Sequence, residues 1–425
     1  MKNIFTLFLF AMASLNPLDA QDFVPVPLGA SYANQAYYNL NTDNIEWVSN
    51  ESWDLAFTIN PGTAGIFVNE ATTASFTGEA PSLKLYLAPT TDFADPIDPA
   101  TLTDSLYNEE VDWENGAFNN PREEGNSDDY GWGTYNATTQ AIEGNRVYAL
   151  NMRNGSWKKI FIESMANGAY KLKYANLNGD NEGTATIDKA DFGDSPFALF
   201  SFGSGMAMAS PSNWDLLFTR YQAALDPGSG VVVQYPVTGV LHGPGVQSAE
   251  ARDVDPDDVD YEPYLDSLSS QLDIIGQDWK FFNLGELSWV IDLNRAYFVK
   301  TTENRLWKIV FYAFDGISSG IFTFEKTDLG LLSNTKSLSG SLSSLSTFPN
   351  PVVGEMTVSF TLAESREKLP LYLLNTIGQP VWRTSIQGQA GLNVLNLNPG
   401  LLASGIYYLV VGDGEDSLTQ KVVVK

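Results

Sequence analysis

Cysteine is absent from the 425 residues of the chain, and histidine occurs once, as His242. The absence of cysteine excludes disulfides, thiolate zinc sites and cysteine nucleophiles. A protein that crosses into an oxidising compartment without disulfides has to hold its fold by core packing alone. A single histidine excludes bis-histidine ligation of a metal or haem within one chain. The sequence also contains no phosphate-binding glycine loop, and Ser-His-Asp catalysis would have to use His242, so nothing in it calls for an enzyme.

Positive charge is scarce as well. The chain has 24 Lys and Arg residues against 51 Asp and Glu residues, which gives a net charge of −27 and a pI of about 4.2. Such a surface repels phosphate backbones and anionic lipids, so nucleic acids and membrane surfaces are poor partners. Cations and basic molecules remain compatible with it.

Long apolar runs are rare, and the most marked one lies at the N-terminus. The ten residues Ile4–Ala13 follow Lys2 and precede the small residue Ala20. A bilayer span needs about 20 residues, so this run is too short to cross a membrane. The pattern predicts a secretory signal peptide over residues 1–20, and no other segment predicts a transmembrane span.

The remaining sequence favours strands over helices. Aromatic residues make up 12% of the chain, and short apolar stretches alternate with Gly, Asn, Asp and Pro clusters. This pattern is typical of β-strands joined by turns, and no long helical periodicity is present. The sequence therefore predicts an all-β protein.

One strand motif is written twice. Residues 52–58 read SWDLAFT and residues 213–219 read NWDLLFT. In a strand, alternate side chains share a face, so Trp53 is expected beside Leu55 and Phe57.

A second pair of motifs follows downstream. The segment 145–148, NRVY, is followed by Trp157, and the segment 294–297, NRAY, is followed by Trp307. Similar offsets at several motifs indicate a tandem duplication. We place copy 1 at residues 21–189 and copy 2 at residues 190–332.

The C-terminal part has a different character. Residues 333–347 are rich in serine and predict a flexible linker. Residues 348–425 alternate strand-like runs with turns and predict a small antiparallel β-sandwich.

This C-terminal segment resembles the type A C-terminal sorting domain of the bacterial type IX secretion system. The resemblance rests on FPNPV, LYLLNTIGQPV, LNLNPGLLASGIYYLVV and the final KVVVK, which occur in that order. It implies an Ig-like sandwich that is recognised by the type IX translocon and a sortase. It also implies transport through the periplasm to the cell surface or the extracellular space. The residues that carry the signal by this resemblance are Pro349, Asn350, Pro351, Gly378, Gly405, Tyr407 and Lys425.

The duplicated region resembles the HmuY-like family of secreted all-β proteins. The resemblance rests on WDLAF, WDLLFTRY, the two NRxY segments and the WK strands. Founding members are haemophores that hold haem between two axial side chains, so the resemblance implies two tandem HmuY-like domains with haem as a candidate ligand. This chain departs from the family pattern because it has only one histidine.

Four residues are candidate haem ligands under this interpretation. His242 is the first, and Met206 or Met208 could supply the second axial position. Tyr221, just after the repeated strand, is a further candidate. The alternatives are a solvated loop histidine, core or loop methionines, and a packed aromatic ring with a hydrogen-bonded hydroxyl.

An acidic cluster offers a second kind of site. Asp253, Asp255, Asp257 and Asp258 could supply carboxylate oxygens to a calcium ion. The alternative is a solvated acidic loop, because the spacing fits no calcium-loop register.

The sequence thus predicts an exported, non-enzymatic binding protein, for which the HmuY-like resemblance makes haem or a related compound a candidate ligand. The alternative is a structural or adhesive surface protein that binds glycan or protein. The residues do not decide between them.

Overall fold

The computed structural model describes residues 23–71, 74–75, 78–79, 83–226, 228, 230–332, 342–400, 402–413 and 416–425. The expected signal peptide, residues 1–20, and residues 333–341 of the expected linker lie outside this part. The described chain is built of sheets whose strand pairs are antiparallel except for β26 with β32, which is parallel, and this confirms the all-β class. Its helices are short 3-10 turns: η1 (Ala30–Tyr32), η2 (Pro99–Thr101), η3 (Ala117–Asn119), η4 (Lys189–Phe192), η5 (Glu262–Ser267) and η6 (Gly316–Ser318). The chain divides into two compact units, Met1–Leu331 and Leu332–Lys425.

The first unit contains two lobes. The terminal lobe takes strands from both ends of the unit and encloses one aromatic core, which includes Tyr38, Phe218 and Phe324. One of its sheets has the order β1-β25-β24-β23-β20, and another has the order β19-β18-β2-β3. Their bounds are β1 (Phe23–Pro27), β2 (Asn34–Tyr38), β3 (Ile45–Ser49), β18 (Leu216–Leu225), β19 (Val233–His242), β20 (Gln247–Arg252), β23 (Arg295–Lys300), β24 (Arg305–Phe314) and β25 (Ile321–Leu331), with a hairpin of β21 (Lys280–Asn283) and β22 (Ser288–Ile291).

The inserted lobe is formed by the residues between these segments, and its separate core includes Phe57, Trp132 and Tyr148. Its larger sheet has the path β10-β11-β13-β12-β8-β9, with β14 beside β13 and β15 beside β14, and its smaller sheet has the order β17-β16-β4-β5. The bounds are β4 (Leu55–Thr58), β5 (Ile66–Val68), β8 (Lys84–Leu87), β9 (Ser105–Leu106), β10 (Gly133–Asn136), β11 (Ala141–Gly144), β12 (Val147–Asn151), β13 (Trp157–Ala166), β14 (Ala169–Ala175), β15 (Gly183–Asp188), β16 (Phe197–Ser201) and β17 (Met206–Ala209), with a short hairpin of β6 (Ala74–Ser75) and β7 (Gly78–Glu79).

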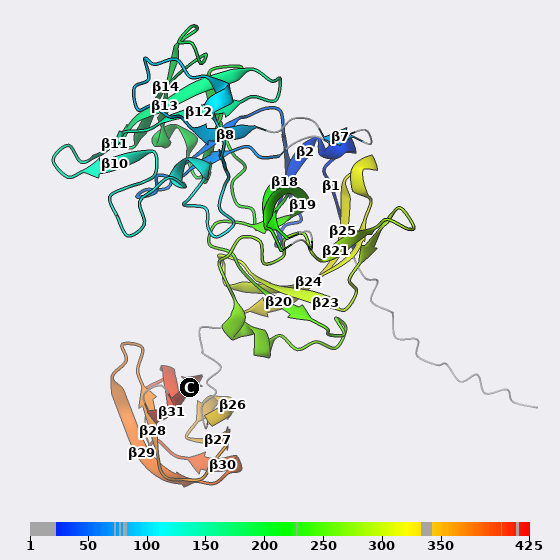
Figure 1. Cartoon of the computed structure of the whole chain (residues 1–425). Coiled ribbons are helices and arrows are strands. Elements are labelled where there is room, and N and C mark those ends of the chain that lie inside the picture. The colour runs from blue at the N-terminus through cyan, green and yellow to red at the C-terminus, as the bar shows by residue number, and fades with distance from the viewer. Residues whose placement is uncertain are drawn as a thin grey trace, which may run out of the picture. The chain divides into compact units, whose positions relative to one another are not determined.

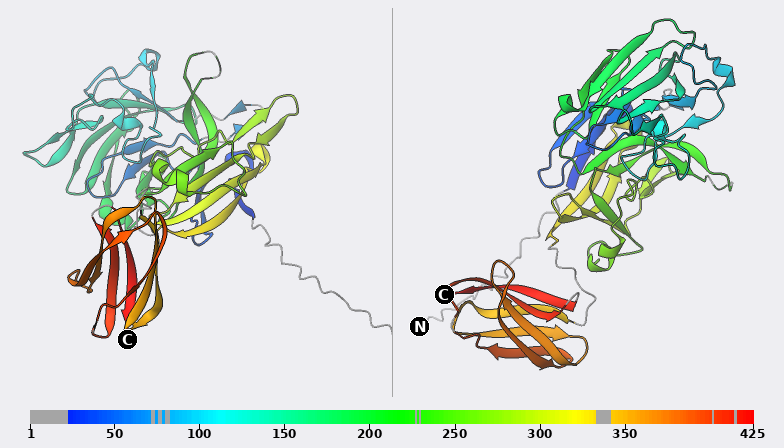
Figure 2. Two further views of the ribbon diagram at one scale, coloured as in Figure 1. Left: turned by 90° about the horizontal axis from the view of Figure 1, so that it is seen from below. Right: turned by 90° about the vertical axis from the view of Figure 1, so that its left-hand side faces the viewer.

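The two sequence copies exchange their opening strands. β1 pairs with β25 and β2 pairs with β18, so the start of the chain completes sheets that are built near residues 216–331. Reciprocally, β16, the first strand after residue 190, pairs with β4 of copy 1. The blue strand β1 accordingly lies beside the yellow strand β25 in Figure 1, and blue and yellow strands stay together in both views of Figure 2. Strand pairing therefore crosses the boundary that we placed between residues 189 and 190.

The repeated Trp-Asp motif has the same surroundings in both copies. Leu216 of β18 is paired with Tyr38, and Leu55 of β4 is paired with Phe200. Leu55 and Phe57 face the inserted core as expected, but Trp53 packs on the other side. The expectation that Trp53 shares their face is wrong, because the regular strand begins only at Leu55 and alternation does not extend back to the tryptophan.

The downstream alignment also needs a correction. Tyr148 is paired with Ile160, and Tyr297 is paired with Ile309, so these pairs are equivalent. If Ile160 is equivalent to Ile309, then Lys159 is equivalent to Lys308 and Lys158 is equivalent to Trp307. Trp157 therefore lies one position before the residue that is equivalent to Trp307. A shift of one residue moves a side chain to the opposite face of a sheet. Trp307 accordingly belongs to the terminal core, whereas Trp157 packs in an outer cluster.

The second unit is a β-structure with a single core. Its strands follow the order β29-β28-β31-β32-β26-β27-β30. Alternate residues of β27, from Met356 to Leu362, pack with Leu371 of β28 and Leu409 of β31, so the two ends of this path face one another across the core. The bounds are β26 (Leu342–Val353), β27 (Glu355–Leu362), β28 (Arg366–Leu374), β29 (Pro380–Gly388), β30 (Gly391–Leu397), β31 (Gly405–Asp413) and β32 (Asp416–Val424).

Candidate functional site

The two lobes of the first unit meet at an aromatic cluster, here called the central cluster. It forms because each repeated strand buries both of its faces: Leu216 and Phe218 face the terminal core, whereas Leu217 faces the central cluster. In the other copy, Ala56 takes the position of Leu217. The smaller side chain leaves space on the side of the inserted lobe.

The rings of the central cluster touch one another edge to face. Trp214 lies 5.1 Å from Tyr37 and 6.0 Å from Trp113, measured between ring centroids. Trp113 in turn lies 5.3 Å from Phe197 and 5.7 Å from Phe67. Such edge-to-face pairs stabilise a packed wall beyond the area that they bury. The cluster therefore gives the junction between the lobes a rigid aromatic lining.

A cavity of about 80 Å³ lies within this junction, here called the central cavity. A single water needs roughly 10–15 Å³ of such space, so the volume suits several waters or one small organic group. Residues of both lobes line it, among them Trp53 and Phe67 from the inserted lobe and Tyr37, Trp214 and Tyr221 from the terminal lobe.

Two carboxyl groups stand in the lining of the central cavity. The Glu70 carboxylate accepts hydrogen bonds from the backbone N–H groups of Asn108 at 2.7 Å and Gln222 at 3.3 Å. Burial nevertheless raises the pKa of Glu70 to about 8. Burial and the neighbouring Asp273 raise the pKa of Glu110 to about 7. Both groups therefore change charge close to neutral pH.

Several polar atoms in the lining lack a partner. The Trp53 and Trp214 indole N–H groups and Oε1 of Glu110 are buried and form no hydrogen bond with the described residues. Each belongs to a residue that lines the central cavity. A buried polar group without a partner costs about 1–3 kcal/mol, so a guest that satisfied these atoms would be stabilised there.

The central cavity also holds one basic side chain. Arg220 of β18 is buried, with 4% exposure, and lines the cavity. Its guanidinium lies 5.3 Å from the centre of the Tyr32 ring, which belongs to the terminal core. A cation–π interaction with the Tyr32 ring therefore helps to stabilise the buried charge of Arg220.

Sequence reasoning did not find Glu70, Glu110 or Arg220. A local signal was available for two of them, because Glu70 comes two positions after the apolar run 66–68, IFV, and Arg220 lies within the largely apolar segment 216–221, LLFTRY. A charge placed inside a buried strand often marks a site. Glu110 gave no such signal, since it lies among other acids in a loop.

His242 is not a loop residue, as the sequence suggested, but the last residue of β19. Its side chain is buried, with 1% exposure, and its Nε2 has no partner among the described residues. Burial lowers the pKa of His242, so the imidazole stays neutral near pH 7. It lines a second cavity of about 330 Å³, together with Asp112 and Phe197. Its backbone carbonyl accepts the indole N–H of Trp113 at 2.9 Å.

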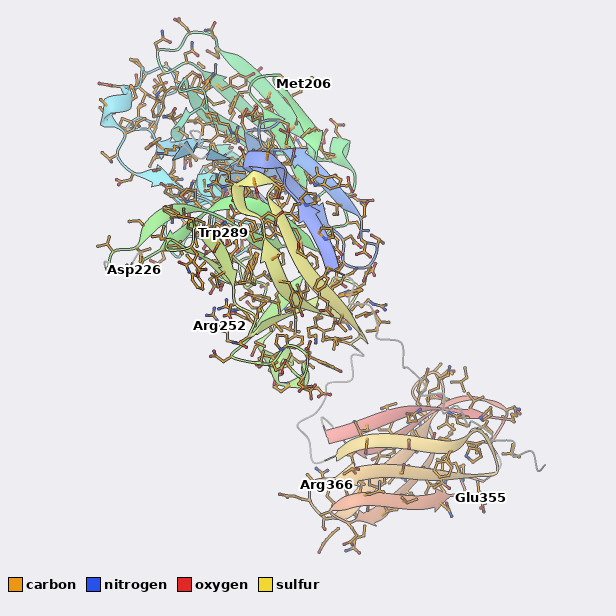
Figure 3. The ribbon with its side chains drawn as sticks, turned by 90° about the vertical axis from the view of Figure 1, so that its right-hand side faces the viewer. Met206, Asp226, Arg252, Trp289, Glu355 and Arg366 are labelled. Carbon is orange, nitrogen blue, oxygen red and sulfur yellow. The ribbon has the colours of Figure 1, made fainter. Side chains whose placement is uncertain are left out.

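The other candidate haem ligands lie elsewhere. Tyr221 is buried in β18 and lines the central cavity, and burial raises the pKa of its hydroxyl well above the usual value. Met206 and Met208 are 70% and 40% exposed on the edge strand β17, and Figure 3 shows Met206 at the surface. These methionines line neither cavity. The structure thus does not bring the four residues together in one of these cavities.

The acidic cluster is solvated. Asp253, Asp255 and Asp257 border a shallow surface pocket with Tyr312. Asp258 lies one position further along the same turn, and its backbone N–H donates to the carbonyl of Asp255. Within the described residues, no three His, Asp or Glu side chains are grouped so that they could hold a metal ion.

Several of the expected sorting residues tie the end of the second unit together. The Asn350 side chain donates to the carbonyl of Lys421 and accepts the N–H of Val423, both at 2.9 Å. The N–H of Lys425 donates to Val352 at 3.0 Å, and the Tyr407 hydroxyl donates to Ala403 at 2.9 Å.

The remaining expected sorting residues occupy strands and a turn. Gly378 has a φ of 79° in the turn before β29, a conformation that glycine adopts most easily. Pro349 and Pro351 lie in β26, and Gly405 begins β31.

Comparisons with known proteins identify this second unit. Residues 346–425 match a family model described as the secretion system C-terminal sorting domain. No curated protein matches the chain. Among solved structures, dimeric latent PorU from Porphyromonas gingivalis matches at 8% identity and a TM-score of 0.18, covering 92% of this chain and 34% of that one. The chain thus spans about a third of the length of that protein.

The helices in the described part of the chain are too short to cross a membrane. Three observations apply to the same C-terminal residues. They are the order of the four sequence motifs, the hydrogen bonds between β26 and β32, and the family match. Residues 346–425 are a type IX secretion C-terminal sorting domain, and the protein is exported by that system to the cell surface or outside the cell.

Proposed function

We propose that residues 23–331 are an extracellular binding body that holds a small polar ligand in the central cavity. The observation that carries the proposal is the set of unpartnered polar atoms of Trp53, Trp214 and Glu110 in an aromatic lining. Binding sites are typically concave, mostly apolar and equipped with a few such polar groups.

The HmuY-like resemblance of the repeated strands supports binding rather than catalysis. We therefore propose no enzymatic activity for this body. Haem, which that resemblance implies, is a poor fit to the central cavity because a porphyrin is far larger than a space of about 80 Å³. We propose instead that the guest is a small organic molecule.

The test uses the exported protein and a variant with a filled cavity. Ala56→Leu places in copy 1 the side chain that copy 2 carries as Leu217, so the larger residue suits a strand of this type. Thermal unfolding is measured with panels of amino acids, monosaccharides, alkylammonium salts and haem. A ligand that binds the cavity should raise the melting temperature of the wild type and not that of Ala56→Leu. The proposal would be contradicted if no compound raised the melting temperature of the wild type more than that of Ala56→Leu.

A second candidate is adhesion, and one observation favours it. The hairpin between β18 and β19 exposes Val231, Val232 and Tyr235 by 61%, 64% and 58%. Exposed apolar side chains in one place are typical of surfaces that contact other proteins. Replacing Val232 and Tyr235 by serine should then weaken adherence of the cells to a protein-coated surface without changing the melting temperature.

A further inference from the structure

We propose that the central cavity binds a primary ammonium group, so that the ligand is a small organic cation, with Glu110 as its anionic partner. This inference rests on the proposed function, and it names the class of ligand. It is carried by the charge of the lining, by its aromatic walls and by the unpartnered oxygen of Glu110.

The lining has an excess of acid. Glu70, Glu109 and Glu110 line the cavity, and Arg220 is the only basic residue among the described lining residues. Arg220 itself lines the cavity and its guanidinium lies 5.3 Å from the Tyr32 ring, so one positive charge stands among three carboxyl groups. A net charge of −27 on the whole chain also raises the local concentration of cations at such a cleft. Because Glu70 has a pKa of about 8 and Glu110 a pKa of about 7, the lining becomes more negative, and more favourable to a cation, as Glu110 ionises.

The walls suit a cation. Trp53, Trp214 and Tyr37 line the cavity, and Trp and Tyr faces attract ammonium groups through the negative charge of their π-systems. The attraction is largest where water is excluded. The indole N–H groups of the two tryptophans also lack partners. They are donors, so an ammonium group alone leaves them unsatisfied, and an organic cation that also carries a hydrogen-bond acceptor would satisfy them.

Glu110 supplies the specific contact. Its Oε1 is buried without a partner, while the carboxyl group interacts with Asp273 across the junction. Two carboxyls so close to each other hold a proton between them near neutral pH. An ammonium group can replace that proton and donate an N–H to Oε1. A quaternary ammonium has no N–H to donate, so the geometry favours a primary amine.

The experiment compares three probes of similar size, n-butylammonium, n-butanol and tetramethylammonium, by titration of the tryptophan fluorescence of the exported protein. We expect n-butylammonium to bind about tenfold more tightly than either of the others. Glu110→Gln should remove this preference, and Glu46→Gln, at an exposed position of β3, should retain it. Circular dichroism of both variants checks that they are folded.

The pH dependence gives a second measurement. The charged or titratable groups around Glu110 are Glu70, Glu109, Asp273, Tyr221 and Arg220. Affinity for n-butylammonium should rise from pH 6 to pH 8 in the wild type as Glu110 ionises, and this rise should be smaller in Glu110→Gln. An equal rise in both proteins would overturn the role of Glu110.

The remaining outcomes separate the two proposals. If n-butanol binds as tightly as n-butylammonium, and Ala56→Leu blocks both, the cavity binds ligands but the ammonium inference fails. If tetramethylammonium binds as tightly as n-butylammonium, the proposal that the ligand donates an N–H to Glu110 is wrong. If no probe binds and no member of the larger panel does, both the inference and the proposed function fail.

Discussion

Asp215 accepts the backbone N–H of Leu40 at 2.8 Å, across 175 positions of the chain. Asp54 makes the equivalent contact in the other copy, where it accepts the N–H of Phe202 at 2.8 Å. In both cases the donor lies just beyond the strand that pairs with the repeated motif. The aspartate of the Trp-Asp motif therefore fastens each repeated strand to the strand that the other copy contributes.

The two aspartates should differ in their response to amidation. Asp54 lies 3.1 Å from Arg153 in a largely buried ion pair. Burial raises the pKa of Asp54 and lowers the pKa of Arg153 despite this pair, so desolvation exceeds their attraction. Asp54→Asn leaves Arg153 buried without its counter-charge and should cost about 3 kcal/mol of unfolding free energy.

Asp215→Asn is the matched comparison. Burial raises the pKa of Asp215 to about 6, so the ionised carboxylate is itself disfavoured in the folded state. An amide oxygen can accept the same N–H, and we expect a change within about 1 kcal/mol. Urea unfolding at pH 7 measures both variants. Equal losses would contradict the difference that we assign to Arg153.

Glu70 should make stability depend on pH. Its folded pKa of about 8 lies above the unfolded value, so its contribution is fully present below about pH 4.5 and is lost as pH rises toward 8. Glu70→Gln cannot ionise, so its unfolding free energy should fall less between pH 5 and pH 7. The difference between the two proteins should grow by roughly 2 kcal/mol over this range.

The comparison with Glu70→Gln removes other titrating groups from the result. The lowered pKa of His242 acts in the opposite direction, because its contribution is lost as pH falls, but it is common to both proteins. Lys280, whose pKa burial lowers to about 7, contributes mainly above this range. Parallel pH profiles of the two proteins would contradict the burial of an ionisable Glu70.

The exchange of strands predicts which fragments fold. Residues 51–211 contain the strands that enclose the inserted core, from β4 to β17. Residues 21–189 correspond to one sequence copy, but they lack β16, leave β1 without its partner β25, and leave β2 paired with β3 but not with β18. We expect the first fragment to unfold cooperatively in urea and the second to aggregate. A cooperative transition of residues 21–189 at the midpoint of the full protein would show that the exchange is dispensable.

A buried arginine should matter more than an exposed one. Arg295 lies 2.9 Å from Glu250, 3.0 Å from Asp278 and 3.1 Å from Asp292, with 9% of its side chain exposed. Arg295→Ala removes the buried charge that these carboxylates share and leaves Glu250 and Asp278 with the exposed Arg252 alone, so it should cost about 2–4 kcal/mol.

Arg305→Ala is the control for Arg295→Ala. Arg305 pairs with Asp328 at the surface, where solvent screens the pair, and little change is expected. Urea unfolding with and without 0.5 M salt, roughly enough to shorten screening below 5 Å, compares the two. Similar losses in both variants would contradict a role for burial.

Haem should not bind through His242. Its imidazole is 1% exposed, and it lines a different cavity from Tyr221. We expect a haem titration of the exported protein to give the same Soret absorbance with and without His242→Ala. Saturable one-to-one binding that disappears in this variant would establish His242 as an axial ligand and would favour the haem interpretation.

The sequence by itself determined the strands of this protein and its export to the cell surface or outside the cell. Turn clusters and alternating apolar residues predicted the strands, and the motifs around Asn350 and Tyr407 predicted the sorting domain that the family match identifies. The repeated Trp-Asp motif predicted a duplication. These features are local, because a turn, an alternating strand and a short motif each express their physics within a few neighbouring residues.

The tertiary structure alone decided which strands pair and which side chains meet. Alternation shows that Leu216 and Leu55 are buried, but it cannot show that Tyr38 and Phe200 cross over to pair with them. Pairing is chosen by backbone hydrogen bonds and packing between residues far apart in the chain, which leave no local pattern. The central cavity is a consequence of that exchange, since Glu110 and Trp214 face one space only after the copies interlock.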